Sequence, residues 1–159
     1  MLNNKLWVIG GYDGENKNDV WSSIDGVSWI QITSNAEFSK RQQHQVAVFD
    51  NKLWVVGGRE GLSGDIKNDI WSSINGITWN RVTDNAGILA RTGHEVMTFD
   101  NKLWIIRAGG GVWSSSNGIT WKVETRHGSF SNLGGGVVLN NEIWLTGRGK
   151  GALKKGGLI

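Results

Sequence analysis

The chain has 159 residues, with 24 glycines, 10 tryptophans, no proline and no cysteine. The lack of cysteine excludes disulfides and thiolate metal sites, and it leaves the cellular compartment open. The formal net charge is +3, and the lysines and arginines recur among acidic residues rather than in one basic stripe, so no nucleic-acid partner is expected. No window reaches the ~18 apolar residues of a membrane span, and residues 1–5 show no signal-peptide core.

The tryptophans follow an internal repeat. The string Asn-Lys-Leu-Trp ends at Trp7, Trp54 and Trp104, and a weaker Asn-Glu-Ile-Trp ends at Trp144, with spacings of 47, 50 and 40 residues. Two further motifs follow it, and they carry the remaining tryptophans: Trp21, Trp71 and Trp113 in one, Trp29, Trp79 and Trp121 in the other. Every tryptophan therefore occupies a repeat position, which is typical of a repeat architecture.

Each unit predicts four short strands, because apolar and β-branched residues come in short runs broken by Gly, Asn and Asp. In the second unit, strands are expected at 44–49, 53–57, 69–73 and 77–83. Asp50-Asn51 predicts a tight turn, and Asn75-Gly76 predicts a hairpin because both residues tolerate positive φ. No segment has a helical period, so each unit is expected to be an antiparallel meander.

A single four-stranded sheet of this size cannot bury both faces, so it has to stack on neighbours like itself. The sequence thus predicts an all-β propeller with tryptophans between its blades. Blades are expected at about 1–33, 43–83 and 93–125, with a partial blade at 134–147. Residues 148–159 form a basic Gly/Lys-rich tail, either a decayed blade segment or foreign sequence.

The repeat resembles the kelch family, in which a diglycine after the second strand precedes spaced aromatic residues. The matching residues are Gly10-Gly11, Gly57-Gly58, Trp21, Trp29, Trp71, Trp79, Arg41 with His44, and Arg91 with His94. The resemblance covers nearly the whole chain and implies a β-propeller. The third unit departs from it with a shortened loop at Arg107-Ala108-Gly109-Gly110-Gly111, and the fourth has Ser131 and Gly134 in place of Arg and His.

Residues 23–29 and 73–79 also resemble the Asp-box hairpin of sialidase propellers, one residue shorter. That hairpin is a structural turn, so the likeness supports the propeller and implies no sialidase activity.

Three units and a fraction are fewer than the six or seven blades usual in kelch rings. The expected structure is an open arc with apolar blade faces exposed at both ends. Two explanations stay open: the chain is a fragment of a longer gene product, or two copies form a homodimer that completes a ring of about six to eight blades.

The long links between strands and between blades are predicted on one side of the propeller, and loops on a rigid scaffold are the usual place for binding residues. The candidate ligand-binding residues on this side are Tyr12, Arg41, Arg59, Glu60, Arg91 and Arg107. Their cationic, hydrogen-bonding character suits carboxylates or polyols. Because Arg41 and His44 recur as Arg91 and His94, a blade-joining role is favoured for those residues.

The loop Asp13-Gly14-Glu15-Asn16, with Asp19, offers several oxygens for calcium, but Asp69 recurs at the position of Asp19 and favours a structural role. No paired carboxylates, nucleophile motif, phosphate loop or His-metal spacing is present in the sequence. We therefore predict no catalytic residue, metal or cofactor.

The sequence favours a non-catalytic module that binds a protein or a glycan. One alternative is a sugar-acid-modifying enzyme of the kelch-propeller type, such as a sialic acid mutarotase, with Arg, Glu and His near the ring centre; another is an inactive propeller fragment. The copper site of galactose oxidase is excluded, since it needs a Tyr-Cys cross-link and the chain has no cysteine.

Overall fold

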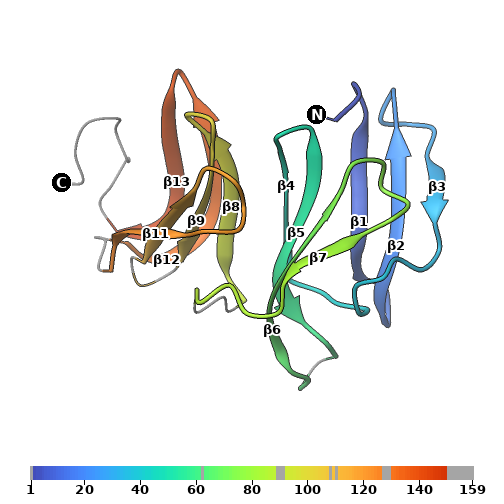
Figure 1. Cartoon of the computed structure of the whole chain (residues 1–159), viewed down its shortest axis with the longest axis horizontal. Helices are drawn as coiled ribbons and strands as arrows, with labels where there is room; N and C mark the ends of the chain where they lie inside the picture. The colour runs from blue at the N-terminus through green and yellow to red at the C-terminus, as the bar shows by residue number, and fades with distance from the viewer. Residues whose placement is uncertain are drawn as a thin grey trace.

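The structure is a computed structural model that describes residues 2–61, 63–88, 92–107, 109, 111–126 and 130–149. These residues form four antiparallel sheets, which stand side by side in chain order (Figure 1). None of the described ranges forms a helix long and apolar enough to cross a membrane.

The sheets are named here blades 1 to 4. Blade 1 contains β1 (Leu6–Tyr12), β2 (Asn16–Ser23) and β3 (Ile30–Thr33). Blade 2 contains β4 (Gln45–Phe49), β5 (Lys52–Arg59), β6 (Ile66–Ser73) and β7 (Asn80–Thr83). Blade 3 contains β8 (His94–Phe99), β9 (Lys102–Arg107), β10 (Val112–Ser115) and β11 (Lys122–Thr125), and blade 4 contains β12 (Phe130–Leu139) and β13 (Glu142–Gly149).

The turn that precedes the Lys/Glu-Leu/Ile-Trp strand of each blade is the tight one that the sequence predicts; in blades 2 to 4 it joins the first two strands. Asp50 and Asn51 have φ values of 49° and 53°, in the left-handed region that short polar side chains tolerate. The same pair of positive φ values recurs at Asn3-Asn4, Asp100-Asn101 and Asn140-Asn141. Lys52 pairs with Phe49 across this turn, which sets the register of β4 on β5.

The hairpin after β6 differs in mechanism from the prediction. Only Gly76 has a positive φ, of 76°, whereas Asn75 acts through its side chain. Its Oδ1 accepts hydrogen bonds from the backbone N–H groups of Ile77 (2.9 Å) and Thr78 (3.0 Å), and Ser73 Oγ accepts one from Gly76 (2.8 Å). The hairpin is therefore held by side-chain to backbone bonds, and β7 begins at Asn80 rather than at residue 77.

Three apolar clusters join successive blades. Ile9, Val20 and Phe38 pack with Leu53 and Trp79 between blades 1 and 2. Between blades 2 and 3, the buried residues are Ala47, Phe49, Trp54, Val56, Ile70, Ile88, Val96, Leu103 and Ile105. Met97, Phe99, Ile106, Val112 and Ile143 join blades 3 and 4. Stacking sheets thus bury the apolar positions that no single sheet can cover.

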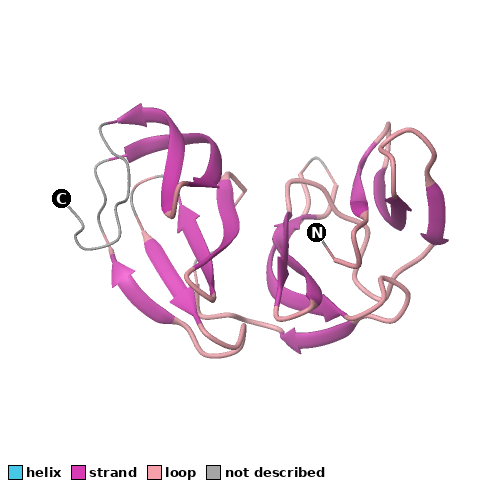
Figure 2. Ribbon diagram, turned by 90° about the horizontal axis from the view of Figure 1, so that it is seen from above, coloured by secondary structure: helices cyan, strands magenta, loops and turns pink. Residues whose placement is uncertain are grey.

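The predicted all-β partial propeller is confirmed, since the sheets follow an open arc rather than a closed ring (Figure 2). In the described residues, blade 1 has three strands and blade 4 has two. β13 runs to Gly149, two residues beyond the predicted end of the last blade. Residues 150–159, the rest of the predicted tail, lie outside the described residues.

Candidate functional site

A pocket of about 580 Å³ opens between blades 1 and 2. It is lined by Tyr12, Gly14, Glu15, Asn16, Ser39, Lys40, Glu60 and Gly61. These residues come from the link between β1 and β2, from the segment that joins the two blades, and from the end of β5 with the loop after it. The sequence predicts binding in all three of these segments.

Backbone hydrogen bonds fix the segment that joins blades 1 and 2. Arg41 N–H donates to the carbonyl of Lys17 (2.9 Å), and Arg41 C=O accepts from Gly11 (3.1 Å). Gln42 and Arg59 exchange bonds of 3.0 and 2.9 Å. The segment is therefore tied to β1 and β2 on one side and to β5 on the other, which holds the pocket walls in place.

The Arg41 side chain lies beneath this segment, and only 1% of it is exposed. Its guanidinium donates two bonds to the Asp69 carboxylate, of 2.6 and 2.9 Å, and one to the carbonyl of Gly57 (2.9 Å). Nη2 also donates to Ser39 Oγ (2.9 Å), and Nε donates to the carbonyl of Ser39 (3.1 Å). Arg41 thus orients Ser39 toward the pocket, and all of these partners belong to the protein itself.

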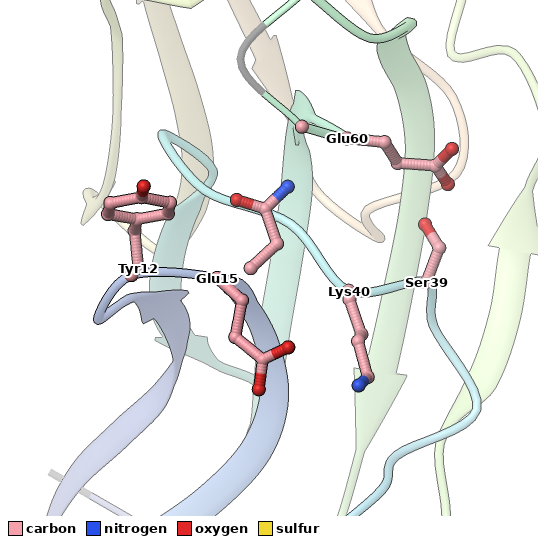
Figure 3. A pocket seen from close by; sticks show the side chains of 8 residues that line it. Tyr12, Glu15, Ser39, Lys40 and Glu60 are labelled. Atoms are coloured by element: carbon pink, nitrogen blue, oxygen red, sulfur yellow. The ribbon is translucent and has the colours of Figure 1, made fainter.

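The carboxylate of Glu60 is held between a hydroxyl and an ammonium group. A hydrogen bond from Ser39 is the main cause that lowers the pKa of Glu60, with Lys67, whose Nζ lies 3.0 Å away, acting in the same direction. Burial opposes the shift. Figure 3 shows the Glu60 side chain extending toward Ser39. Glu60 is therefore ionised at neutral pH.

Glu15 is the second carboxylate of the lining. Lys17 Nζ donates to Glu15 Oε1 at 2.7 Å, and this bond, with the charges of Lys17 and Lys40, lowers the pKa of Glu15. The same Lys17 ammonium lies 3.3 Å from the carboxylate of Asp13. Asp13 and Glu15 are thus bound to a lysine, and the described residues contain no group of three His, Cys, Asp or Glu side chains placed to hold a metal.

Tyr12 and Lys40 are exposed side chains of the pocket, as Glu15 is. Half of Tyr12 is exposed, and Lys40 is exposed as well. In Figure 3 the Tyr12 ring stands at one side of the pocket, and the Lys40 side chain extends between Glu15 and Ser39. The pocket therefore offers an aromatic face, an ammonium donor and two carboxylate acceptors.

The part of the chain that forms the pocket matches a known domain family. The sequence model of the DUF6242 beta propeller domain matches residues 2–89, which is more than half of the chain. The chain belongs to this family. The matched segment covers blades 1 and 2 and every residue that lines the pocket. The match supports the β-propeller without specifying kelch repeats, and the comparison with curated proteins finds no match.

The structure of this DUF6242 propeller domain places the six predicted ligand-binding residues differently. Tyr12 and Glu60 meet in the pocket. Arg59 is half-buried beside it, where its Nε donates to the carbonyl of Gly61 (3.0 Å). Arg107 ends β9 in blade 3 and is not in the lining, Arg41 is buried as described above, and Arg91 lies outside the described residues.

The two histidines of the described blades form bonds between blades. His44 Nε2 lies 2.8 Å from the carbonyl of Ile9, and His94 Nε2 lies 3.3 Å from the carbonyl of Val56. Burial lowers the pKa of His44 to about 4. The neutral ring of His44 therefore donates from Nε2 to blade 1, in agreement with the blade-joining role that the repeat favours.

The sequence motifs do not single out Glu15, Asn16, Ser39 or Lys40 for binding a protein or glycan, and they offer Glu15 and Asn16 only as calcium ligands. Their position in long links was the available indication, but nothing in the spacing reveals that the loops of two blades converge. That convergence depends on the segment that joins blades 1 and 2, whose backbone is hydrogen-bonded to β2 and to β5.

Proposed function

We propose that this propeller domain is a non-catalytic binding module that holds a glycan in the pocket between blades 1 and 2, with a protein segment as the alternative ligand. The observation that carries the proposal is the exposed Tyr12 ring beside Lys40, Glu15 and Glu60 in one pocket. Membership of a β-propeller family supports a binding or scaffold role in general.

A glycan fits the chemistry of this lining. The face of an aromatic ring packs against the C–H face of a sugar, while ionised carboxylates accept hydrogen bonds from hydroxyl groups. Lys40 adds a donor for ring or hydroxyl oxygens. The pocket volume of about 580 Å³ lies within the ~300–1,000 Å³ typical of small-ligand sites.

We also propose that the repeats are of the kelch type, and the Arg-x-x-His motif at Arg41 and His44 supports this assignment. His44 bonds across to Ile9 of blade 1, whereas the Arg41 guanidinium bonds to Asp69 within blade 2. A mutarotase-like enzyme would need such Arg and His groups accessible to its substrate. Because Arg41 and His44 are engaged with Asp69 and Ile9, we favour binding without catalysis.

A glycan-array screen followed by saturation-transfer NMR and calorimetry on the best ligand tests the proposal. We expect Tyr12→Ala and Lys40→Ala each to weaken binding by about tenfold or more, because they remove the stacking face and the donor. Lys122→Ala is the matched control, since Lys122 is an exposed lysine of blade 3 that also lies beside a glutamate. Binding that Tyr12→Ala leaves unchanged, or no binding to any glycan or peptide, would overturn the proposal.

A further inference from the structure

Successive blades meet through a repeated contact between a tryptophan and a glycine. A Cβ atom at Gly76 would overlap the indole ring of Trp7, and one at Gly118 would overlap the ring of Trp54. The tryptophan of the Asn-Lys-Leu-Trp string in one blade therefore lies on the hairpin glycine of the next blade, where only a residue without a side chain leaves room. We call the side that offers the indole the outgoing face and the side that offers the glycine the incoming face.

No described residue of another blade packs on the incoming face of blade 1. At Gly26, which corresponds to Gly76, the one described neighbour that a Cβ would meet is the Leu6 side chain, at 3.4 Å. Leu6 is 44% exposed, whereas its counterpart Leu53 in blade 2 is 0% exposed. Val8 is exposed and its counterpart Val55 is buried. This face thus has the glycine slot and the apolar surface of an inter-blade contact without an indole in the slot.

The outgoing face of blade 4 offers the complementary half of this contact. Trp144 is 44% exposed, whereas its counterpart Trp54 is 2% exposed. Val137 and Leu139 are exposed as well, and their counterparts Ala47 and Phe49 are buried. This face therefore offers an indole and apolar strand residues that meet no hairpin glycine in the described residues.

We propose that the outgoing face of blade 4 in one copy binds the incoming face of blade 1 in a second copy. The chain carries both halves of a contact that it already uses between its own blades, and the two halves lie at the separated ends of the arc (Figure 2). An indole needs a glycine slot, so neither face pairs with itself. The association is head-to-tail, and two copies that each use both faces close a ring.

Mass measurement over a concentration series is the first test. We expect assemblies of at least two 17.5 kDa chains by light scattering. Gly26→Asn fills the slot with a residue that adopts positive φ elsewhere in this chain, and Leu6→Asp places a charge on the same face; each should weaken self-association at least about tenfold. Ile77→Asp is the control, since Ile77 is also exposed but lies on the hairpin of blade 2.

Circular dichroism separates loss of association from loss of folding. A monomer at every concentration, with a native spectrum, would overturn the proposal and mean that these faces serve another partner. Dimers that Gly26→Asn and Leu6→Asp leave intact, with their native spectra retained, would overturn it as well.

Disulfide trapping is the second test, and the cysteine-free sequence makes it clean. Val8→Cys and Val137→Cys replace residues whose counterparts Ile105 and Ala47 share one core cluster. A mixture of the two single variants should give a covalent dimer on oxidation, whereas each variant alone should stay uncross-linked. Equal cross-linking of one variant alone would show a symmetric contact and contradict the head-to-tail arrangement. Both tests are independent of the pocket, so their failure leaves the proposed glycan site untouched.

Discussion

Blades 1 and 2 contain the same motifs in different surroundings. Trp21 Nε1 donates to Asp19 at 2.8 Å, and Trp71 Nε1 donates to Asp69 at 2.7 Å, so the local bonds repeat. Asp69 also receives the buried Arg41, whereas the described residues give Asp19 no arginine counterpart. The comparison shows that each motif forms its local turn and hydrogen bonds by itself, while the ion pair depends on the segment that precedes the blade.

The largest effect is expected at the tryptophans of the second strands. Trp54→Ala should lower the free energy of unfolding by on the order of 3–5 kcal/mol, because it empties the contact with Gly118 and leaves the carbonyl of Phe49 without its indole donor. Trp144→Ala should cost less in the monomer, about 1–2 kcal/mol, because nearly half of Trp144 is exposed and no hairpin glycine in the described residues packs on it. Urea titration followed by circular dichroism at low protein concentration measures both.

Equal losses for the two tryptophan variants would contradict this view of the blade contacts. A loss below about 1 kcal/mol for Trp54→Ala would mean that the tryptophans do not hold the blades together.

Comparing Asp69→Ala with Asp19→Ala separates the contribution of the Arg41 ion pair to stability from that of the tryptophan hydrogen bond. Asp69→Ala should cost on the order of 3–5 kcal/mol, because it leaves the buried Arg41 guanidinium without its carboxylate. Asp19→Ala removes only the acceptor of the Trp21 indole and should cost about 1 kcal/mol. Calorimetric unfolding of both variants measures the difference in stability. Equal losses would mean that the Arg41–Asp69 ion pair adds little to the stability that the Trp71–Asp69 hydrogen bond gives.

The free energy of unfolding should decrease as the pH is lowered, because His44 becomes protonated. Burial lowers the pKa of His44 to about 4 in the folded protein, so between the ordinary value near 6.5 and 4 the unfolded chain binds more protons. The contribution of His44 is complete above pH 6.5 and is lost as the pH falls to 4, by on the order of 3 kcal/mol. Arg41 and His94 lower the pKa of His44 in the same direction as burial does.

His44→Gln keeps a donor at this position but does not titrate in that range. The difference in unfolding free energy between the protein and this variant, measured from pH 7 to pH 4, isolates His44 from other groups. Glu95 is one such group, because burial raises its pKa and its effect has the opposite sign. A pH-independent difference would contradict the buried, neutral His44.

The fold was predictable from the sequence because its signals are local. The Asp50-Asn51 turn, the diglycine and the periodic tryptophans each act within a few residues, and together they define the blades. The pocket was predictable only in part: Tyr12 ends β1 at the start of a long, irregular link, which the sequence marks as a binding candidate. Lys40 contributes to the site because two loops from different blades converge, and no motif in the sequence encodes that distance.

The smallest effects are expected at Lys17 and Lys67, which occupy equivalent positions in blades 1 and 2. Each neutralises a pocket carboxylate at the surface, Glu15 at 2.7 Å and Glu60 at 3.0 Å. Changing either lysine to alanine should alter the unfolding free energy by less than about 0.5 kcal/mol, because exposed ion pairs contribute little. The pKa values of the two carboxylates should nevertheless respond differently to these changes.

In Lys17→Ala the pKa of Glu15 should rise toward its ordinary value, because the Lys17 hydrogen bond is the main cause that lowers it. In Lys67→Ala the pKa of Glu60 should stay low, because the hydrogen bond from Ser39 is its main cause. Carboxyl ¹³C chemical shifts followed over pH measure both values. A larger rise at Glu60 than at Glu15 would mean that Lys67, rather than Ser39 held by Arg41, keeps Glu60 ionised in the pocket.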